Sequence, residues 1–164
     1  MCSTTRRNRS ATRWTELERA LGAPEIERLI LDIRYNPGGD LGTARGLHRL
    51  IQEDPRFQER GSLIVLTTRN TFSAAVVFSL WLQRDVQPVF IGEPTGGRPL
   101  MYENNRPVTL PHSRLVVYLS TRARSDVDAS DTRTAIEPDR FIPLTAADYF
   151  AGRDPVLDAA LAWE

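Results

Sequence analysis

A serine at the start of a predicted helix is the side chain best suited to act as a nucleophile in this chain. Ser73 lies in the segment 70–75 (NTFSAA), between an apolar run at 63–66 and an apolar run that predicts a helix over 73–82. The first N–H groups of a helix lack intrahelical partners and can bind an anion. Ser73 could therefore attack a carbonyl carbon from this turn. The alternative interpretation is a helix N-cap, a position that serine fills commonly.

Two glycine-rich segments could supply backbone groups to the same chemistry. One is 36–39 (NPGG), directly after the apolar run 29–33, and the other is 92–98 (GEPTGGR). Ligands of parallel-sheet domains bind at the carboxyl ends of strands, where the N–H groups of Gly38 and Gly39 could converge on a developing oxyanion. For both segments the alternative is a tight turn that needs positive φ. The second segment is not a Walker loop, because it lacks the Gly-Lys-Ser/Thr ending.

Groups that could activate a serine are scarce. All 21 basic residues are arginine, so no lysine can serve as the base. His48 falls inside a predicted helix and His112 in a predicted hairpin turn, where isolated histidines are commonly structural or solvated. Asp131 and Glu137 could orient a base or bind a substrate amine, with a solvated loop acid as the alternative. Two histidines without clustered carboxylates make a poor metal site, so we expect no metal.

The elements that must position these residues alternate between strands and helices. Short apolar runs at 29–33, 62–67 and 89–91 are typical of strands buried on both faces of a parallel sheet. Helices are predicted over 14–21, 43–52, 73–82, from 145 onwards and over 154–163, with Pro155 at the first position of the last one. A hairpin is predicted from 107–110 and 115–119, followed by a surface loop over 122–134 and an extended piece over 141–143. This alternation predicts a layered α/β domain.

Composition limits the function classes. The chain has 164 residues, which favours one domain, and its 21 acidic residues balance its 21 arginines. A neutral chain has no electrostatic footprint for nucleic acid or an anionic membrane, so neither is an expected partner. Residues 1–13 predict a disordered basic arm without the apolar segment of a secretory signal, and the single Cys2 excludes an internal disulfide. We expect a cytoplasmic protein, and the sequence leaves its oligomeric state open.

Together, these segments resemble a known peptidase family. Residues 29–39 (LILDIRYNPGG) resemble the first signature of the tail-specific, or C-terminal-processing, serine peptidases of family S41. Residues 70–75 resemble the nucleophile segment of that family, and 91–97 (IGEPTGG) resemble the loop that follows it. Residues 136–139 (IEPD) and 154–160 (DPVLDAA) are similar to the closing Pro-Asp turn and final helix. The resemblance covers the chain from about Ile26 to Ala162.

The resemblance implies a fold, an activity and a set of site residues. The fold would be ClpP/crotonase-like, with stacked β-β-α units in a domain over 14–164 that lacks its N-terminal part. The activity would be that of a serine-type endopeptidase that hydrolyses peptide or protein substrates without a cofactor. Ser73 would be the nucleophile, Gly38 or Gly39 would form the oxyanion hole with the N–H of Ala74, and Gly96, Gly97 and Arg98 would form a substrate loop.

The chain departs from the family pattern at the base. Many members place a lysine where this chain has Arg98, and an arginine with a pKa above ~12 cannot act as a general base. Other branches use a histidine from upstream of the first signature, and this chain has none before His48. The base therefore lies on a missing segment, or His48 is recruited, or the domain is inactive. Asp131 is the preferred acid and Glu137 the second choice.

Two further functions fit the same fold. The first is a non-catalytic module that binds a peptide or an apolar ligand. An apolar face formed by Phe72, Val76, Val77 and Phe78 is compatible with that function and equally with a plain core. The second is a crotonase-type acyl-CoA enzyme, which the closing Pro-Asp turn and final helix fit less well than they fit the peptidases.

Overall fold

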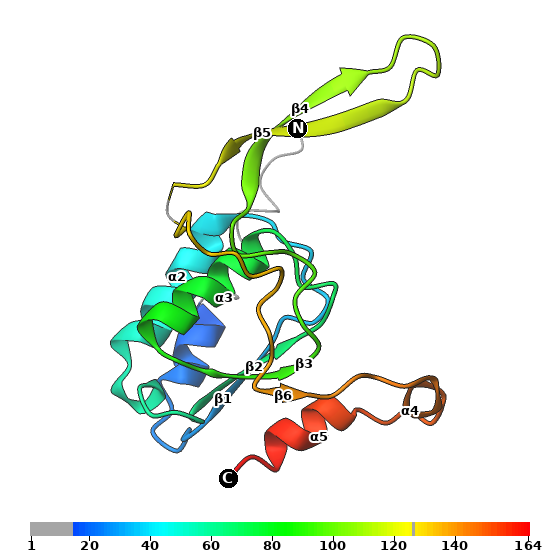
Figure 1. Ribbon diagram of the computed structural model, residues 1–164. Coiled ribbons are helices and arrows are strands. Elements are labelled where there is room, and N and C mark those ends of the chain that lie inside the picture. The colour runs from blue at the N-terminus through cyan, green and yellow to red at the C-terminus, as the bar shows by residue number, and fades with distance from the viewer. Residues whose placement is uncertain (1–14, 126) are drawn as a thin grey trace, which may run out of the picture.

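A parallel sheet of four strands forms the centre of the molecule. The computed structural model describes residues 15–125 and 127–164. Strands β1 (Leu29–Asp32), β2 (Leu63–Thr67), β3 (Val89–Gly92) and β6 (Arg140–Phe141) are neighbours in that order, and every pair is parallel (Figure 1). All residues of β2 and β3 are buried, as their continuous runs of Val, Ile and Leu predict for strands covered on both faces.

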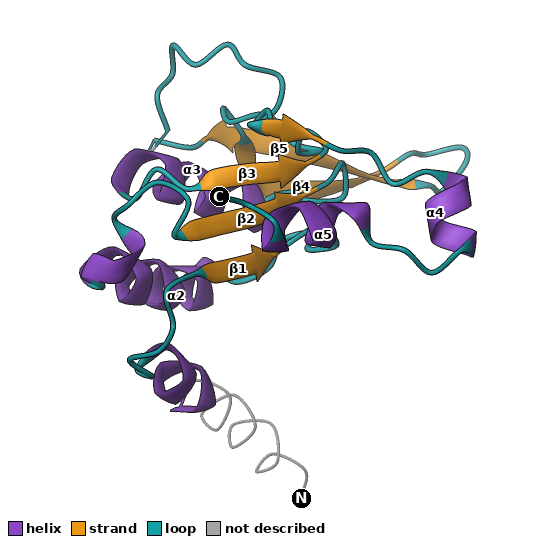
Figure 2. Cartoon of the chain, turned by 90° about the horizontal axis from the view of Figure 1, so that it is seen from below, coloured by secondary structure: helices purple, strands orange, loops and turns teal. Residues whose placement is uncertain are grey.

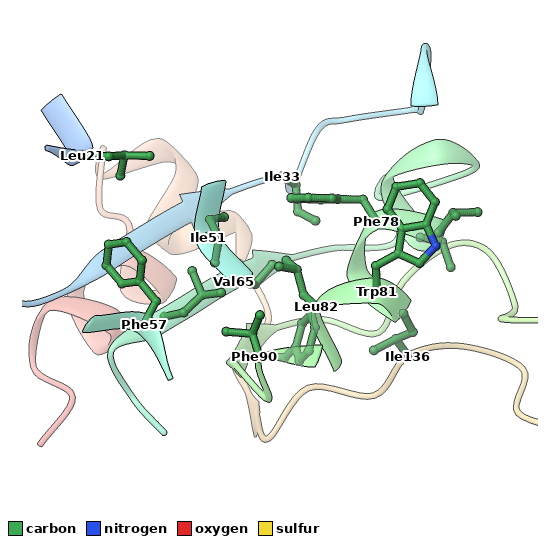
Figure 3. Packing of buried hydrophobic residues seen from close by; sticks show 14 residues of the cluster. Leu21, Ile33, Ile51, Phe57, Val65, Phe78, Trp81, Leu82, Phe90 and Ile136 are labelled. Carbon is green, nitrogen blue, oxygen red and sulfur yellow. The ribbon is translucent and has the colours of Figure 1, made fainter. Parts of the chain in front are cut away.

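Helices cover both faces of this sheet. Helices α2 (Leu41–Glu53) and α3 (Ala74–Asp85) pack on one face, where residues such as Val65, Phe78 and Trp81 form the larger core (Figure 3). Helix α5 (Pro155–Leu161) packs on the other face against Ile64 and Leu66, which alternate with Val65 along β2 (Figure 2). A 3-10 turn (Pro55–Phe57), the short α4 (Ala146–Phe150) and a helical segment over 15–21 complete the helices.

A long hairpin extends away from this body. Strands β4 (Tyr102–Thr109) and β5 (Val116–Ala123) pair antiparallel and form a separate two-stranded sheet. Figure 1 shows the hairpin projecting beyond α2 and α3 at one end of the molecule. The hairpin was predicted, but its strands are longer than the predicted 107–110 and 115–119. The predicted surface loop over 122–134 therefore begins inside β5.

The α/β architecture predicted from the sequence is confirmed. Helix α5 begins at Pro155, and the Thr145 hydroxyl caps α4 by accepting a hydrogen bond from the Asp148 N–H at 3.1 Å. The predicted disordered arm over 1–13 and the first residue of the helix predicted over 14–21 lie outside the described residues. None of the helices in the described ranges is long and apolar enough to cross a membrane.

Arg34 connects the end of β1 to the start of α5. Its guanidinium donates two hydrogen bonds to the Asp154 carboxylate, at 2.7 and 2.8 Å, and further bonds to Asp32. The Arg34 side chain is only 11% exposed, so solvent screens this network less than a surface ion pair. Asp154 also caps α5 by accepting from the Leu157 N–H at 3.0 Å. The network therefore attaches the C-terminal helix to the strand that leads into residues 36–39.

We expect Asp154→Asn to lower the free energy of unfolding at pH 7 by about 1–2 kcal/mol, because asparagine keeps the cap but loses the charge-assisted pair. The hydrogen bonds from Arg34 hold the pKa of Asp154 below its usual range. Such a group stabilises the fold above its unfolded pKa, and this stability disappears as the pH falls through the folded pKa. The difference between wild type and variant should be complete above about pH 5 and shrink below about pH 4. Urea unfolding across this range measures it, and a gap independent of pH would contradict the assignment.

Candidate active site

Ser73 occupies a strained turn between β2 and α3. Its backbone has φ 52° and ψ −121°, a conformation that favours glycine and costs other residues about 1–3 kcal/mol. Ser73 stands at the N-cap position, but its hydroxyl makes no capping hydrogen bond and has no hydrogen-bond partner within residues 15–125 and 127–164. The side chain is partly exposed. The structure therefore contradicts the capping interpretation and leaves the hydroxyl available for a ligand.

Two threonines, the buried Thr71 and the half-buried Thr68, hold the turn that precedes Ser73. Thr71 is fully buried, and its hydroxyl donates to the carbonyl of Ile33 at 2.9 Å and accepts from the Thr68 N–H at 3.1 Å. The Thr68 hydroxyl donates to the carbonyl of Arg34. The Phe72 N–H donates to the carbonyl of Asn36 at 3.0 Å. These bonds fix the turn against the segment that follows β1.

Gly38 lies directly against Ser73. A Cβ added to Gly38 would stand 2.6 Å from the Ser73 Cβ and 3.0 Å from the Ala74 nitrogen. Gly38 also has φ 109°, where a side chain adds backbone strain. Gly38 therefore has the positive φ that the tight-turn interpretation expects, and it also leaves no room for a side chain beside Ser73.

The predicted oxyanion donors differ in their availability. The Gly38 N–H donates to Oδ1 of Asn36 at 2.9 Å, so it is already engaged. The N–H groups of Gly39 and Ala74 make no hydrogen bond with any residue that the structure describes. Gly39 and Ala74 are thus the donors open to an oxyanion, while Gly38 supplies close packing.

The glycine-rich loop after β3 contacts the same turn. The Gly96 N–H donates to the carbonyl of Thr71 at 3.0 Å, and a Cβ on Gly96 would overlap the carbonyl oxygen of Arg69 at 1.9 Å. A Cβ on Gly97 would lie 3.1 Å from the Phe72 ring. Arg98 follows Gly97 and is exposed. The loop therefore borders the serine turn, as its prediction as a substrate loop requires.

His48 does not lie near Ser73. Its Nε2 stands 3.0 Å from Oδ2 of Asp85, the last residue of α3, although the direction is not that of a hydrogen bond. Its ring packs edge-on against Trp81 at 5.8 Å between centroids. Ser73 precedes the other end of this 12-residue helix, and a rise of ~1.5 Å per residue separates the two ends by roughly 18 Å. The structure offers no route for His48 to act as the base.

The two candidate acids occupy different surroundings. Arg133 contacts the Asp131 carboxylate at 2.7 Å, and this hydrogen bond holds the pKa of Asp131 below its usual range. Asp131 faces the middle and end of α3, in a pocket lined with Val77, Leu80 and Trp81. Glu137 is exposed and has no partner among the described residues. The preceding Ile136 exchanges hydrogen bonds with Thr95, which places Glu137 beside the loop that borders Ser73.

Two side chains important for this geometry were not singled out from the sequence. Asn36 engages the Gly38 N–H with its carboxamide, and Thr71 joins the serine turn to the end of β1. Both are residue types that commonly bond to nearby backbone in turns, and both lie inside the quoted motifs. The apolar face proposed for a ligand is largely core, because Val76, Val77 and Phe78 are buried in the larger cluster. Within the described residues, no group of three or more side chains could hold a metal ion.

Comparison with known proteins supports the fold. No family model matches the sequence, and no curated protein matches it at a significant level. Among solved structures, the chain is similar to a protein from Bacteroides fragilis described as an S41 protease, with 20% identity and a TM-score of 0.58. It is also similar to a protein from Parabacteroides merdae described as a peptidase, with 21% identity and a TM-score of 0.61. The tricorn protease gives 21% identity and a TM-score of 0.62.

These similarities cover most of this chain and a smaller part of the others. The matches span 90% of this chain and 48% of the Bacteroides chain, 90% and 55% for the Parabacteroides chain, and 82% and 14% for the tricorn protease. The chain thus spans about half the length of the first two structures and a small part of the third. The chain has the α/β fold of the S41 peptidases.

Proposed function

We propose that the chain is a serine-type peptidase domain in which Ser73 is the nucleophile. The observation that supports this most directly is the Ser73 turn, which holds an unpaired hydroxyl in a strained conformation. The open N–H of Ala74 follows it in the chain, and the open N–H of Gly39 follows Gly38, which packs against Ser73. A protein gains nothing in stability from such strain, and strained residues cluster at functional sites. The similarity of the fold to structures described as proteases also supports this proposal.

The proposed reaction is acyl transfer. The Ser73 hydroxyl oxygen attacks the carbonyl carbon of a peptide bond, and the carbonyl oxygen gains the negative charge. The N–H groups of Gly39 and Ala74 then donate to this oxyanion, and each such donor contributes about 3–4 kcal/mol in serine hydrolases. The tetrahedral intermediate expels the amine, which takes the proton that Ser73 released, and water later hydrolyses the acyl-enzyme.

The proton acceptor is not assigned to a residue of this chain. His48 lies at the far end of α3, an arginine such as Arg98 is not a general base, and the chain contains no lysine. We revise the order of the acids, because Arg133 already engages Asp131 whereas Glu137 lies beside the glycine-rich loop. In this proposal Glu137 binds an amine group of the substrate rather than taking the serine proton.

A fluorophosphonate probe tests the nucleophile. The Ser73 oxygen should displace fluoride from phosphorus and form one adduct per chain, because its hydroxyl is unpaired and next to open N–H donors. Intact-mass and peptide mass spectrometry should locate the adduct on Ser73. Ser73→Ala should remove the adduct, whereas Ser120→Ala, on the exposed hairpin, should retain it. An adduct that persists in Ser73→Ala would overturn the assignment.

The same experiment addresses the non-catalytic alternative. A folded protein that gains no adduct but binds peptides would favour a peptide-binding module of this fold. Isothermal titration with a mixture of unstructured peptides, performed on the Ser73→Ala variant, separates binding from turnover. The specific observation that favours this alternative is the missing base beside Ser73 in the described residues.

A further inference from the structure

The β4–β5 hairpin has one mainly apolar face, here called the apolar face, and one face that carries more polar side chains, here called the polar face. Cross-strand pairing assigns Tyr102, Val108, Val117, Leu119 and Ala123 to one face, together with Arg106. The other face carries the Glu103–Arg122 ion pair and the Asn105–Ser120 hydrogen bond. It also carries Pro107, Thr109, Val116 and Tyr118. Antiparallel sheets with such alternation normally bury the apolar face against a core.

Residues 15–125 and 127–164 leave the apolar face of the hairpin exposed. Leu119 is 50% exposed, and every residue of β5 is exposed. The hairpin projects away from the sheet and its helices (Figure 1). A two-stranded hairpin has only marginal stability by itself, so the exposed face calls for a covering surface.

The C-terminal segment 136–164, here called the C-terminal surface, also exposes large apolar side chains. Its exposed large side chains are Phe141, Leu144, Tyr149, Phe150 and Leu161. Phe150 is 85% exposed, and its ring stacks edge-on against Tyr149 at 5.4 Å. The sheet face beneath this segment is covered by α5 alone among the described helices.

The two surfaces carry opposite charge. The hairpin region 102–124 contains four arginines and one acidic residue, whereas segment 136–164 contains six acidic residues and two arginines. Opposite potentials favour the approach of one surface to the other and suppress contact between like surfaces. Hairpin-to-hairpin contact would instead bring two copies of Arg106 close together on the apolar faces.

We propose that the hairpin of one copy of this chain docks on segment 136–164 of a second copy. The two surfaces lie at opposite ends of the molecule, so one chain cannot bring its own hairpin onto its own C-terminal segment (Figure 1). A reciprocal exchange of hairpins between two copies closes a two-fold dimer, in which each copy gives one hairpin and receives one. Each contact then buries apolar side chains from both partners and pairs basic with acidic groups.

Neighbouring substitutions on opposite faces of β5 test the hairpin. Leu119→Asp places a charge on the apolar face and should raise the dimer dissociation constant by about tenfold or more. Tyr118→Asp places the same charge on the polar face and should change it by less than about twofold. Both residues are exposed, so neither substitution should disturb the fold, and circular dichroism checks this. Analytical ultracentrifugation measures the constants, and raising the salt concentration should also weaken the dimer.

Cross-linking identifies the surface that receives the hairpin. In a Cys2→Ser background, copies with Val117→Cys are mixed with copies with Phe150→Cys and treated with a short bismaleimide. The proposal expects cross-links between residues 117 and 150 of different copies, at a yield reduced by Leu119→Asp and not by Tyr118→Asp. A protein that stays monomeric up to about 1 mM would overturn the proposal, as would cross-links that form mainly between two copies of residue 117.

Discussion

Replacing Gly38 with alanine should slow fluorophosphonate labelling of Ser73 by about 100-fold or more, because misplacing a reacting group by ~1 Å costs this much. The added methyl group would stand 2.6 Å from the Ser73 Cβ, a distance that real Cβ contacts do not reach. Hydrogen bonds fix the turn of Ser73, so it cannot easily move away from the added methyl group. The steric clash should therefore displace the serine, residues 36–39 or both. We also expect the free energy of unfolding to fall by about 2–4 kcal/mol.

Gly152→Ala is the matched control for backbone strain. Gly152 has φ 66°, and a Cβ there would meet nothing within 4 Å. This variant should lose about 1 kcal/mol of stability and label at the wild-type rate. Labelling of Gly38→Ala at the wild-type rate, in a protein that is folded by circular dichroism, would show that Gly38 does not position Ser73.

Ser73→Gly should abolish labelling and at the same time make the protein more stable by about 1 kcal/mol. Glycine adopts the φ 52°, ψ −121° conformation without the steric cost that serine bears there, and this relief exceeds the entropy that glycine loses on folding. Thermal and urea unfolding measure the gain. An increase in stability on removing a polar side chain is the mark of a residue retained for function.

Ser73→Ala distinguishes the effect of losing the hydroxyl from the effect of relieving backbone strain. Alanine keeps the Cβ and therefore the strain, so its stability should stay within about 0.5 kcal/mol of the wild type. Both variants lose the nucleophile, but only glycine should stabilise. Equal stabilities for the two variants would mean that the turn is not strained in solution.

Regular elements follow closely from the sequence because their patterns are local. Continuous apolar runs predicted the positions of strands β1, β2 and β3 to within a residue or two. The burial predicted for all three holds for β2 and β3 only, because β1 is an edge strand, half-buried, with Asp32 exposed. Pro155 and the Thr145 cap marked the starts of the last two helices. The predicted hairpin strands were too short, because residues 103–106 are polar on both faces of β4 and so show no apolar alternation. An alternation of apolar and polar residues arises where one face of a strand is buried, and this hairpin is exposed.

The candidate site was predictable in its backbone and not in its side-chain partners. Residues 36–39 and 70–75 each follow a strand, so their proximity follows from the parallel sheet. The partners of the ionisable residues depend on contacts far apart in the chain. His48 meets Asp85 because α2 and α3 pack side by side, and Arg34 meets Asp154 across 120 positions. No spacing in the sequence encodes such pairs.

The bonds that Thr71 and its neighbours make have a consequence for ligand binding. The turn of Ser73 is joined to the ends of two other strands, at Ile33 and Asn36 on one side and Gly96 on the other. The turn therefore becomes ordered when the sheet folds, before any peptide binds. A peptide that binds here would meet a serine that is already ordered. The entropy cost of binding would then come from ordering the peptide and not from ordering the Ser73 turn.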